Sequence, residues 1–306
     1  VTQTGTMNVS TGTATFNVGT AGDVTLGNAA NDFGTATFTS ARNVVVTDNN
    51  AIALGASTLS GNLSVTAANA AITQSGALAV SGTANFQAGT GNVTLATATN
   101  NFNVVDVTAQ AASLTDANTV TLGNVATTGN LTVVATGLLN QTVGGSVTSG
   151  GTASFTAGAG NNITLSNATN NFTVVRVVSG NNVQLRDVDG FDFGGGASTV
   201  SGALTVTAGG AVTQNSSLAV TGLATFNTGT ADLTLGNAAN NFTTVAITNA
   251  GNATIVDANA IAMNASTLSG ALSVTATNNT LTVAGDVTTS AGNGAITFNA
   301  GTGTVT

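Results

Sequence analysis

The chain has 306 residues and contains no Cys, Pro, Trp, Tyr or His, while Gly alone contributes 39. Charged residues make up 5%, as three Arg and eleven Asp, and the formal net charge is −8. With so few titratable side chains, the chain has almost no groups that could act in acid–base or nucleophilic catalysis. We therefore expect no enzyme, no catalytic residues and no cofactor. Three scattered Arg provide no basic surface for nucleic acid, and no apolar run approaches the ~20 residues of a membrane helix.

The first recognisable element, GTATF at residues 12–16, returns three times along the chain. Its equivalents are GTANF at 82–86, GTASF at 151–155 and GLATF at 222–226. A second marker ends at Phe33, Phe102, Phe172 and Phe242, and a third contains Asp48, Asp116, Asp187 and Asp257. The sequence therefore predicts repeat units at approximately 12–81, 82–150, 151–221 and 222–291, with partial units at both ends.

Over residues 44–102, short strands alternate with small polar turns in three segments, 44–61, 62–82 and 83–102. β-Branched residues dominate the strands, and Gly, Asn and Asp dominate the turns, as expected for an all-β chain. Each segment has the length of one coil of about twenty residues, a common size for such repeats. We therefore predict a parallel β-helix, or β-solenoid, with about three coils per repeat, continuous over residues 1–306. The ten residues left over, 103–112, are expected to lengthen one side of the third coil.

Large apolar residues occupy alternate positions of the predicted strands, with Ala, Ser or Thr between them. Because neighbouring side chains of a strand point to opposite faces, the large residues are expected to fill a narrow core. The predicted core includes Phe16, Phe86, Phe155, Phe226, Leu54, Leu122, Phe193 and Met263. Asn31, Asn50 and Asn69 lie 19 residues apart, so we place them at one corner of successive coils. They are interpreted either as a hydrogen-bonded Asn ladder or simply as good turn residues.

One segment, RDVDGFDFG, offers a weak candidate for calcium binding through Asp187, Asp189 and Asp192. Calcium needs six to eight oxygen ligands, and the twelfth-position Glu of an EF-hand is missing. Alternation also directs Asp192 outward, between two inward Phe residues. The alternative, which we prefer, is a solvated turn in which Arg186 reduces the local charge. We therefore assign no metal site.

Two Thr-x-Thr pairs, Thr13 with Thr15 and Thr35 with Thr37, suggest ice binding as a third function, after the two structural roles given below. Ice binding needs a flat, regular array of outward Thr. These pairs do not recur at coil spacing along the sequence, so we do not favour it.

The strands GNLSVTA at 61–67 and GALSVTA at 270–276, and the ITQSG segment that follows the first of them, resemble a known group. They are similar to the repetitive shaft of the filamentous haemagglutinin family, the exoproteins of bacterial two-partner secretion. The resemblance covers essentially the whole chain and implies a right-handed parallel β-helix. It also implies export through an outer-membrane secretion pore and display as an adhesin at the bacterial cell surface. The amino-terminal secretion domain of such proteins is not recognisable here.

We therefore expect a structural shaft of a secreted surface fibre that holds a tip away from the cell. The alternative is a subunit of a self-assembling extracellular filament, because neither end of the sequence shows a charged or Pro-containing cap. The expected partners are further coils of a longer chain or other copies of itself, end to end or laterally. A secretion pore and a host or neighbouring-cell ligand are further expected partners, and nucleic acid is not expected.

Overall fold

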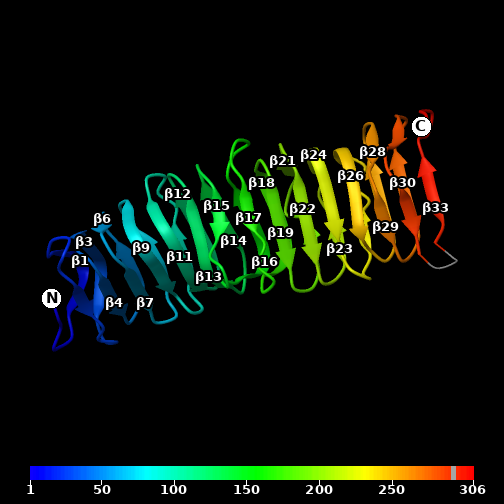
Figure 1. Ribbon diagram of the computed structural model, residues 1–306. Coiled ribbons are helices and arrows are strands. Elements are labelled where there is room, and N and C mark those ends of the chain that lie inside the picture. Colours follow the sequence, from blue (N-terminus) through cyan, green and yellow to red (C-terminus); the bar gives the residue numbers. More distant parts are fainter. Residues whose placement is uncertain (291–293) are drawn as a thin grey trace. The chain divides into compact units, whose positions relative to one another are not determined.

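The computed structural model describes residues 1–290 and 294–306 and contains two compact units, Val1–Gly151 and Thr152–Thr306. The described residues form strands, turns and bends but no helix, so they include no helical membrane span. In each unit the strands follow one another in chain order, as the colours of Figure 1 show. The prediction of one continuous solenoid over 1–306 stays a prediction, and the two units are described separately.

The first unit consists of short strands of three to ten residues joined by tight turns. Its strands are β1 (Asn8–Asn17), β2 (Val24–Leu26), β3 (Asp32–Ser40), β4 (Val44–Asp48), β5 (Ile52–Leu54), β6 (Ser57–Leu59), β7 (Leu63–Ala67), β8 (Ile72–Gln74), β9 (Leu78–Gln87), β10 (Val93–Leu95), β11 (Asn101–Ala109), β12 (Ala112–Asp116), β13 (Val120–Thr127), β14 (Leu131–Ala135) and β15 (Leu139–Gln141).

The second unit begins with the same succession of strand lengths as the first, and β16 (Val147–Thr156) begins in the first unit and ends in the second. Its other strands are β17 (Ile163–Leu165), β18 (Asn171–Ser179), β19 (Val183–Asp187), β20 (Phe191–Phe193), β21 (Ser198–Val200), β22 (Leu204–Ala208), β23 (Val212–Gln214), β24 (Leu218–Asn227), β25 (Leu233–Leu235), β26 (Asn241–Asn249), β27 (Ala253–Asp257), β28 (Ile261–Met263), β29 (Ser266–Leu268), β30 (Leu272–Ala276), β31 (Leu281–Val283), β32 (Val287–Thr289) and β33 (Ile296–Asn299).

Strands of successive coils pair in parallel, which confirms the predicted parallel β-solenoid. In the first unit Val24 pairs with Val44, Val44 with Leu63, and Leu63 with Ala84. Each step advances the chain by 19 to 21 residues, the predicted length of one coil. Parallel pairing satisfies the backbone N–H and C=O groups of each strand through the coils on either side, which is why a chain without Pro suits this fold.

The interior of each unit is filled by the alternate apolar residues of the strands. The core prediction is correct for Leu54, Leu122, Phe86, Phe155, Phe193, Phe226 and Met263, which are all buried. In the second, third and fourth copies, the ring of the GTATF-type Phe meets the ring of the NNF-type Phe, as in Phe86 and Phe102, whose centroids lie 6.1 Å apart. The edge-to-face arrangement of these two rings is a favoured one for aromatic pairs.

Phe16 departs from the prediction because it is only half-buried. Its strand, β1, pairs with β3 and has no described partner strand on its other side. The Phe16 ring therefore packs on one neighbour, stacking on Phe38 with 5.5 Å between centroids. Alternation assigns the direction of the side chain correctly, but burial also requires a coil on each side.

One repeat corresponds to three coils and part of a fourth. Val93 is the equivalent of Val24 in the next copy, yet three coils of pairing lead from Val24 to Ala84, nine residues before Val93. The second unit gives the same result, because three coils lead from Ile163 to Ala224, nine residues before the equivalent Leu233. We expected residues 103–112 to lengthen one side of the third coil. They belong instead to the next coil.

Candidate functional site

A buried Asn occupies one corner of the coil in every copy, and Asn100 shows its contacts most completely. The Asn100 Nδ2 group donates to the backbone oxygens of Leu95 and Thr115, both at 3.1 Å, and to the Gln74 side chain at 2.9 Å. Its Oδ1 accepts from the backbone N–H of Leu78 at 2.9 Å. One side chain thus satisfies backbone groups from three successive coils. Each of these groups would lower the stability of the fold if it were buried without a hydrogen-bond partner. Its equivalents are Asn31, Asn170 and Asn240, all buried.

A buried Asp lies beside each of these Asn residues. In the second copy Asp116 accepts from the backbone N–H of Phe102 at 2.6 Å and from that of Asn118 at 2.8 Å. Burial raises the pKa of Asp116, while these two hydrogen bonds act in the opposite direction. The repeated Asp of the sequence is therefore a structural residue that fixes the turn between two strands. Its equivalents Asp48, Asp187 and Asp257 make the same pair of contacts.

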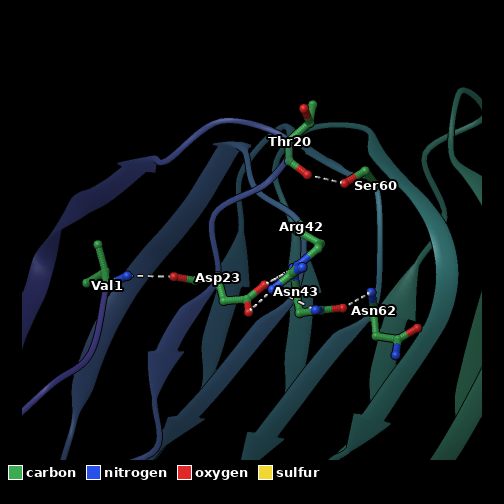
Figure 2. A network of polar contacts seen from close by, with 7 residues as sticks. All are labelled: Val1, Thr20, Asp23, Arg42, Asn43, Ser60 and Asn62. Atoms are coloured by element: carbon green, nitrogen blue, oxygen red, sulfur yellow. Dashed lines mark hydrogen bonds and ion pairs between the residues drawn. The ribbon is translucent and has the colours of Figure 1, made fainter.

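A second polar column lies on the surface, at the corner before β2, β4 and β7 (Figure 2). Asp23 accepts from the backbone N–H and from the side-chain amide of Asn43, both at 3.1 Å. The side-chain oxygen of Asn43 accepts from the N–H of Asn62 at 2.9 Å, and that of Asn62 accepts from Thr83 at 2.8 Å. Each side chain is a rung that joins one coil to the next.

Arg42 adds an ion pair to this column, 2.6 Å from Asp23. Two hydrogen bonds hold the pKa of Asp23 well below its usual range. The larger effect comes from the Arg42 guanidinium, and the next largest from the N–H of Asn43. Both charged side chains are exposed to solvent, so the pair adds little to stability. It is the one ion pair found among residues 1–290 and 294–306.

The surface column recurs in the second unit. Asp232 accepts from the N–H of Asn252 at 2.8 Å and from its side-chain amide at 3.1 Å, and Asn252 accepts from the N–H of Ala271 at 2.9 Å. Asn162 and Asn182 form the same rung, with 3.1 Å from the N–H of Asn182 to the side-chain oxygen of Asn162.

An Asn ladder therefore exists, but not at the corner where the sequence placed it. Asn31, Asn50 and Asn69 do share a corner, yet no described hydrogen bond joins them. Asn31 is buried, Asn50 donates to Asp32 at 3.1 Å, and Asn69 has the left-handed φ of 55° that suits Asn in a turn. The sequence signal for the true ladder is an Asn directly before the first inward residue of a strand, as in Asn43 before Val44.

The second copy lacks the middle rung of the ladder. Asn92 and Asn130 are the equivalents of Asp23 and Asn62, but Ala111 stands where the first copy has Asn43. A surface hollow lies at this point, lined by residues of three successive coils, among them Asn92, Thr94, Ala111, Ser113, Asn130 and Thr132.

The structure disperses the three Asp residues of the calcium candidate. Asp187 is buried and accepts from two backbone N–H groups, at 2.7 and 3.0 Å, so it is not in the solvated turn that we expected. Asp189 caps the turn by accepting from Gly190, and Asp192 accepts from Thr213 at 2.9 Å on the next coil. In the part of the chain that the structure describes, no three acidic side chains are grouped to hold a metal ion.

The two Thr-x-Thr pairs lie on adjacent coils, contrary to the expectation that they do not recur at coil spacing. Thr13 pairs with Thr35, and Thr15 with Thr37, because the coil is 22 residues long here. The array stops after two coils, since Ala53 follows Thr35 in the same column. A two-coil patch is much smaller than the extended array that ice binding needs.

The described geometry defines a repetitive parallel β-solenoid whose recurring polar side chains form hydrogen bonds with backbone groups. Comparison with known families agrees, because a family described as repeats of unknown function (DUF5649) matches residues 1–40, 41–108, 109–179, 180–249 and 250–306. The chain belongs to this family. Its internal divisions have nearly the period that we derived from the sequence but begin at a different point of the repeat. No curated protein and no solved structure matches the chain.

Proposed function

We propose that this chain is part of the shaft of a secreted bacterial surface fibre or adhesin, similar to the filamentous haemagglutinin-like exoproteins of two-partner secretion. In this role it contributes length and stiffness. It reaches the cell surface through an outer-membrane pore, and further coils of a longer chain continue its stack.

The main support is the fractional number of coils per repeat. Three coils and part of a fourth separate equivalent residues. Within each unit, the equivalent residues of consecutive copies therefore lie on different sides of the coil. A residue that occurs once per copy therefore cannot form a continuous array along one side. This arrangement favours a spacer over a periodic binding face such as an ice-binding surface.

The recurring polar residues give further support. The buried Asn and Asp of each copy use their hydrogen-bonding groups on the backbone of adjacent coils. Such residues stabilise the stack, and repeat proteins of this kind owe their stability to contacts between neighbouring units. They are directed to the fold and not to a substrate.

Immunogold electron microscopy of intact bacteria, with antibodies raised against residues 173–242, tests the location. The proposal predicts gold particles outside the outer membrane on untreated cells, and labelling only after permeabilisation would contradict it. The intact mass of the native protein tests the shaft directly. A mass far above 29.3 kDa agrees with a shaft, whereas a mass near that value identifies a separate subunit that builds filaments by self-assembly.

A further inference from the structure

The hollow at Ala111 differs from the rest of the surface because the other copies show what fills it. At the equivalent place in the first copy, the side-chain amide of Asn43 donates to Asp23 at 3.1 Å and its oxygen accepts from Asn62 at 2.9 Å. The fourth copy repeats both contacts with Asn252, again at 3.1 and 2.9 Å. The fold therefore holds a carboxamide group between two coils at this corner, and in the second copy the chain does not supply it.

The hollow retains two polar groups that are paired in the other copies. In the other copies the N–H at this position donates to the side chain one coil below, as from Asn43 to Asp23 at 3.1 Å. The N–H of Ala111 and the side chain of Asn92 have no hydrogen-bond partner within the described residues. Thr94 and Ser113 line the same hollow, together with Val93, Ala111 and Ala112. Apolar lining residues with a few polar groups among them are the usual composition of a ligand site.

We propose that this hollow binds the acetamido group of an N-acetylated hexosamine. An acetamido group carries the same atoms as the missing Asn side chain, namely a carbonyl oxygen, an N–H and an apolar carbon. Its N–H pairs with the side-chain oxygen of Asn92, its oxygen accepts from the N–H of Ala111, and its methyl group contacts the Ala111 side chain. The hydroxyls of Thr94 and Ser113 remain for the sugar ring. The proposal is independent of the shaft function and adds a weak ligand site on the side of the coil.

Titration of the ¹⁵N-labelled protein with N-acetyl-D-glucosamine, followed by ¹H–¹⁵N spectra, tests the site. We expect saturable shifts of the Ala111 and Asn92 amide signals with a roughly millimolar Kd, because a few solvent-accessible hydrogen bonds provide no more. D-Glucose, which lacks the acetamido group, should leave these signals in place. Acetamide alone should shift the same signals.

Two variants make the test specific. Ala111→Asn restores the missing rung and should abolish the shifts without disturbing the rest of the spectrum. Asn252→Ala opens the equivalent hollow in the other unit and should create new saturable shifts at residues 251–253. The proposal is overturned by an absence of saturable shifts in the unmodified protein, by equal shifts in Ala111→Asn, or by equal shifts with glucose. Shifts with acetamide but not with the sugar would overturn it as well.

Discussion

Replacement of the buried Asn100 by Ala should be among the most damaging single changes at a polar position of this chain. The change removes the partner of three backbone groups, the oxygens of Leu95 and Thr115 and the N–H of Leu78. An unsatisfied buried backbone group costs about 1–3 kcal/mol, so the three groups together predict a loss of about 3–9 kcal/mol in the free energy of unfolding. The lower part of this range applies if water enters the space that the amide leaves.

The neighbouring residue provides the matched control. Asn101 is exposed, and Asn101→Ala should change the free energy of unfolding by less than about 0.5 kcal/mol. Urea unfolding followed by circular dichroism measures both variants, and hydrogen exchange of the Leu78 amide shows whether the damage is local. A loss below about 1 kcal/mol for Asn100→Ala, or equal losses for the two variants, would refute the structural role of the buried amide.

Three other predictions concern the core, the buried carboxylates and calcium. Leu63→Ala should lower the free energy of unfolding by about 2–5 kcal/mol, whereas Ser64→Ala, on the opposite face of β7, should have almost no effect; similar losses would mean that the inward assignment is wrong. Burial raises the pKa of Asp187 to about 7, above its value in the unfolded chain, so stability should increase as the pH falls from 8 towards 4 and be lost as the pH rises through 7. Thermal melts at pH 5 and pH 8 test this, and Asp187→Asn should remove a large part of the difference; an unchanged pH dependence in the variant would contradict the assignment. Addition of a calcium chelator should leave the melting temperature unchanged, because the Asp187 carboxylate is occupied by two backbone N–H groups, and a large fall that Asp189→Asn abolishes would reveal a site.

Much of the fold could be predicted because strand periodicity is explicit in this sequence. Leu63 and Val65, for example, are recognisable as inward residues from the Ser and Thr between and after them, and both are buried. The repeat length follows directly from the recurrence of Phe and Asp markers. The parallel stacking follows from strands of similar length at a spacing of about twenty residues, too regular and too rich in turns for other all-β folds.

The polar corners could not be predicted because alternation ends where a strand ends. Asn31 and Asn43 are both turn residues before a strand, and nothing in their spacing shows that Asn31 turns inward while Asn43 forms the surface ladder. The burial of Asp187 is hidden for the same reason, although its alignment with Asp48 and Asp257 indicates a shared structural role. The part coil is hidden in the sequence because coils vary in length, so ten extra residues are equally compatible with one longer coil.

Each copy should contact only adjacent coils, so one full repeat should be removable as a unit. Deletion of residues 173–242 takes out one full repeat and joins Phe172 to Thr243, which restores the NNF-Thr step of both copies. Deletion of residues 173–207 instead joins Phe172 to Ala208, so that two inward residues follow each other and the face of every later side chain is reversed up to the next turn.

The decisive measurement is the thermal unfolding of these two proteins, followed by circular dichroism. The full-repeat deletion should retain the β spectrum and melt cooperatively within a few degrees of the parent, because the contacts at its junction are those of the parent. The half-repeat deletion should lose its cooperative transition or aggregate. Loss of folding in the full-repeat deletion, or equal behaviour of the two proteins, would show that the coils are not held together by local contacts alone.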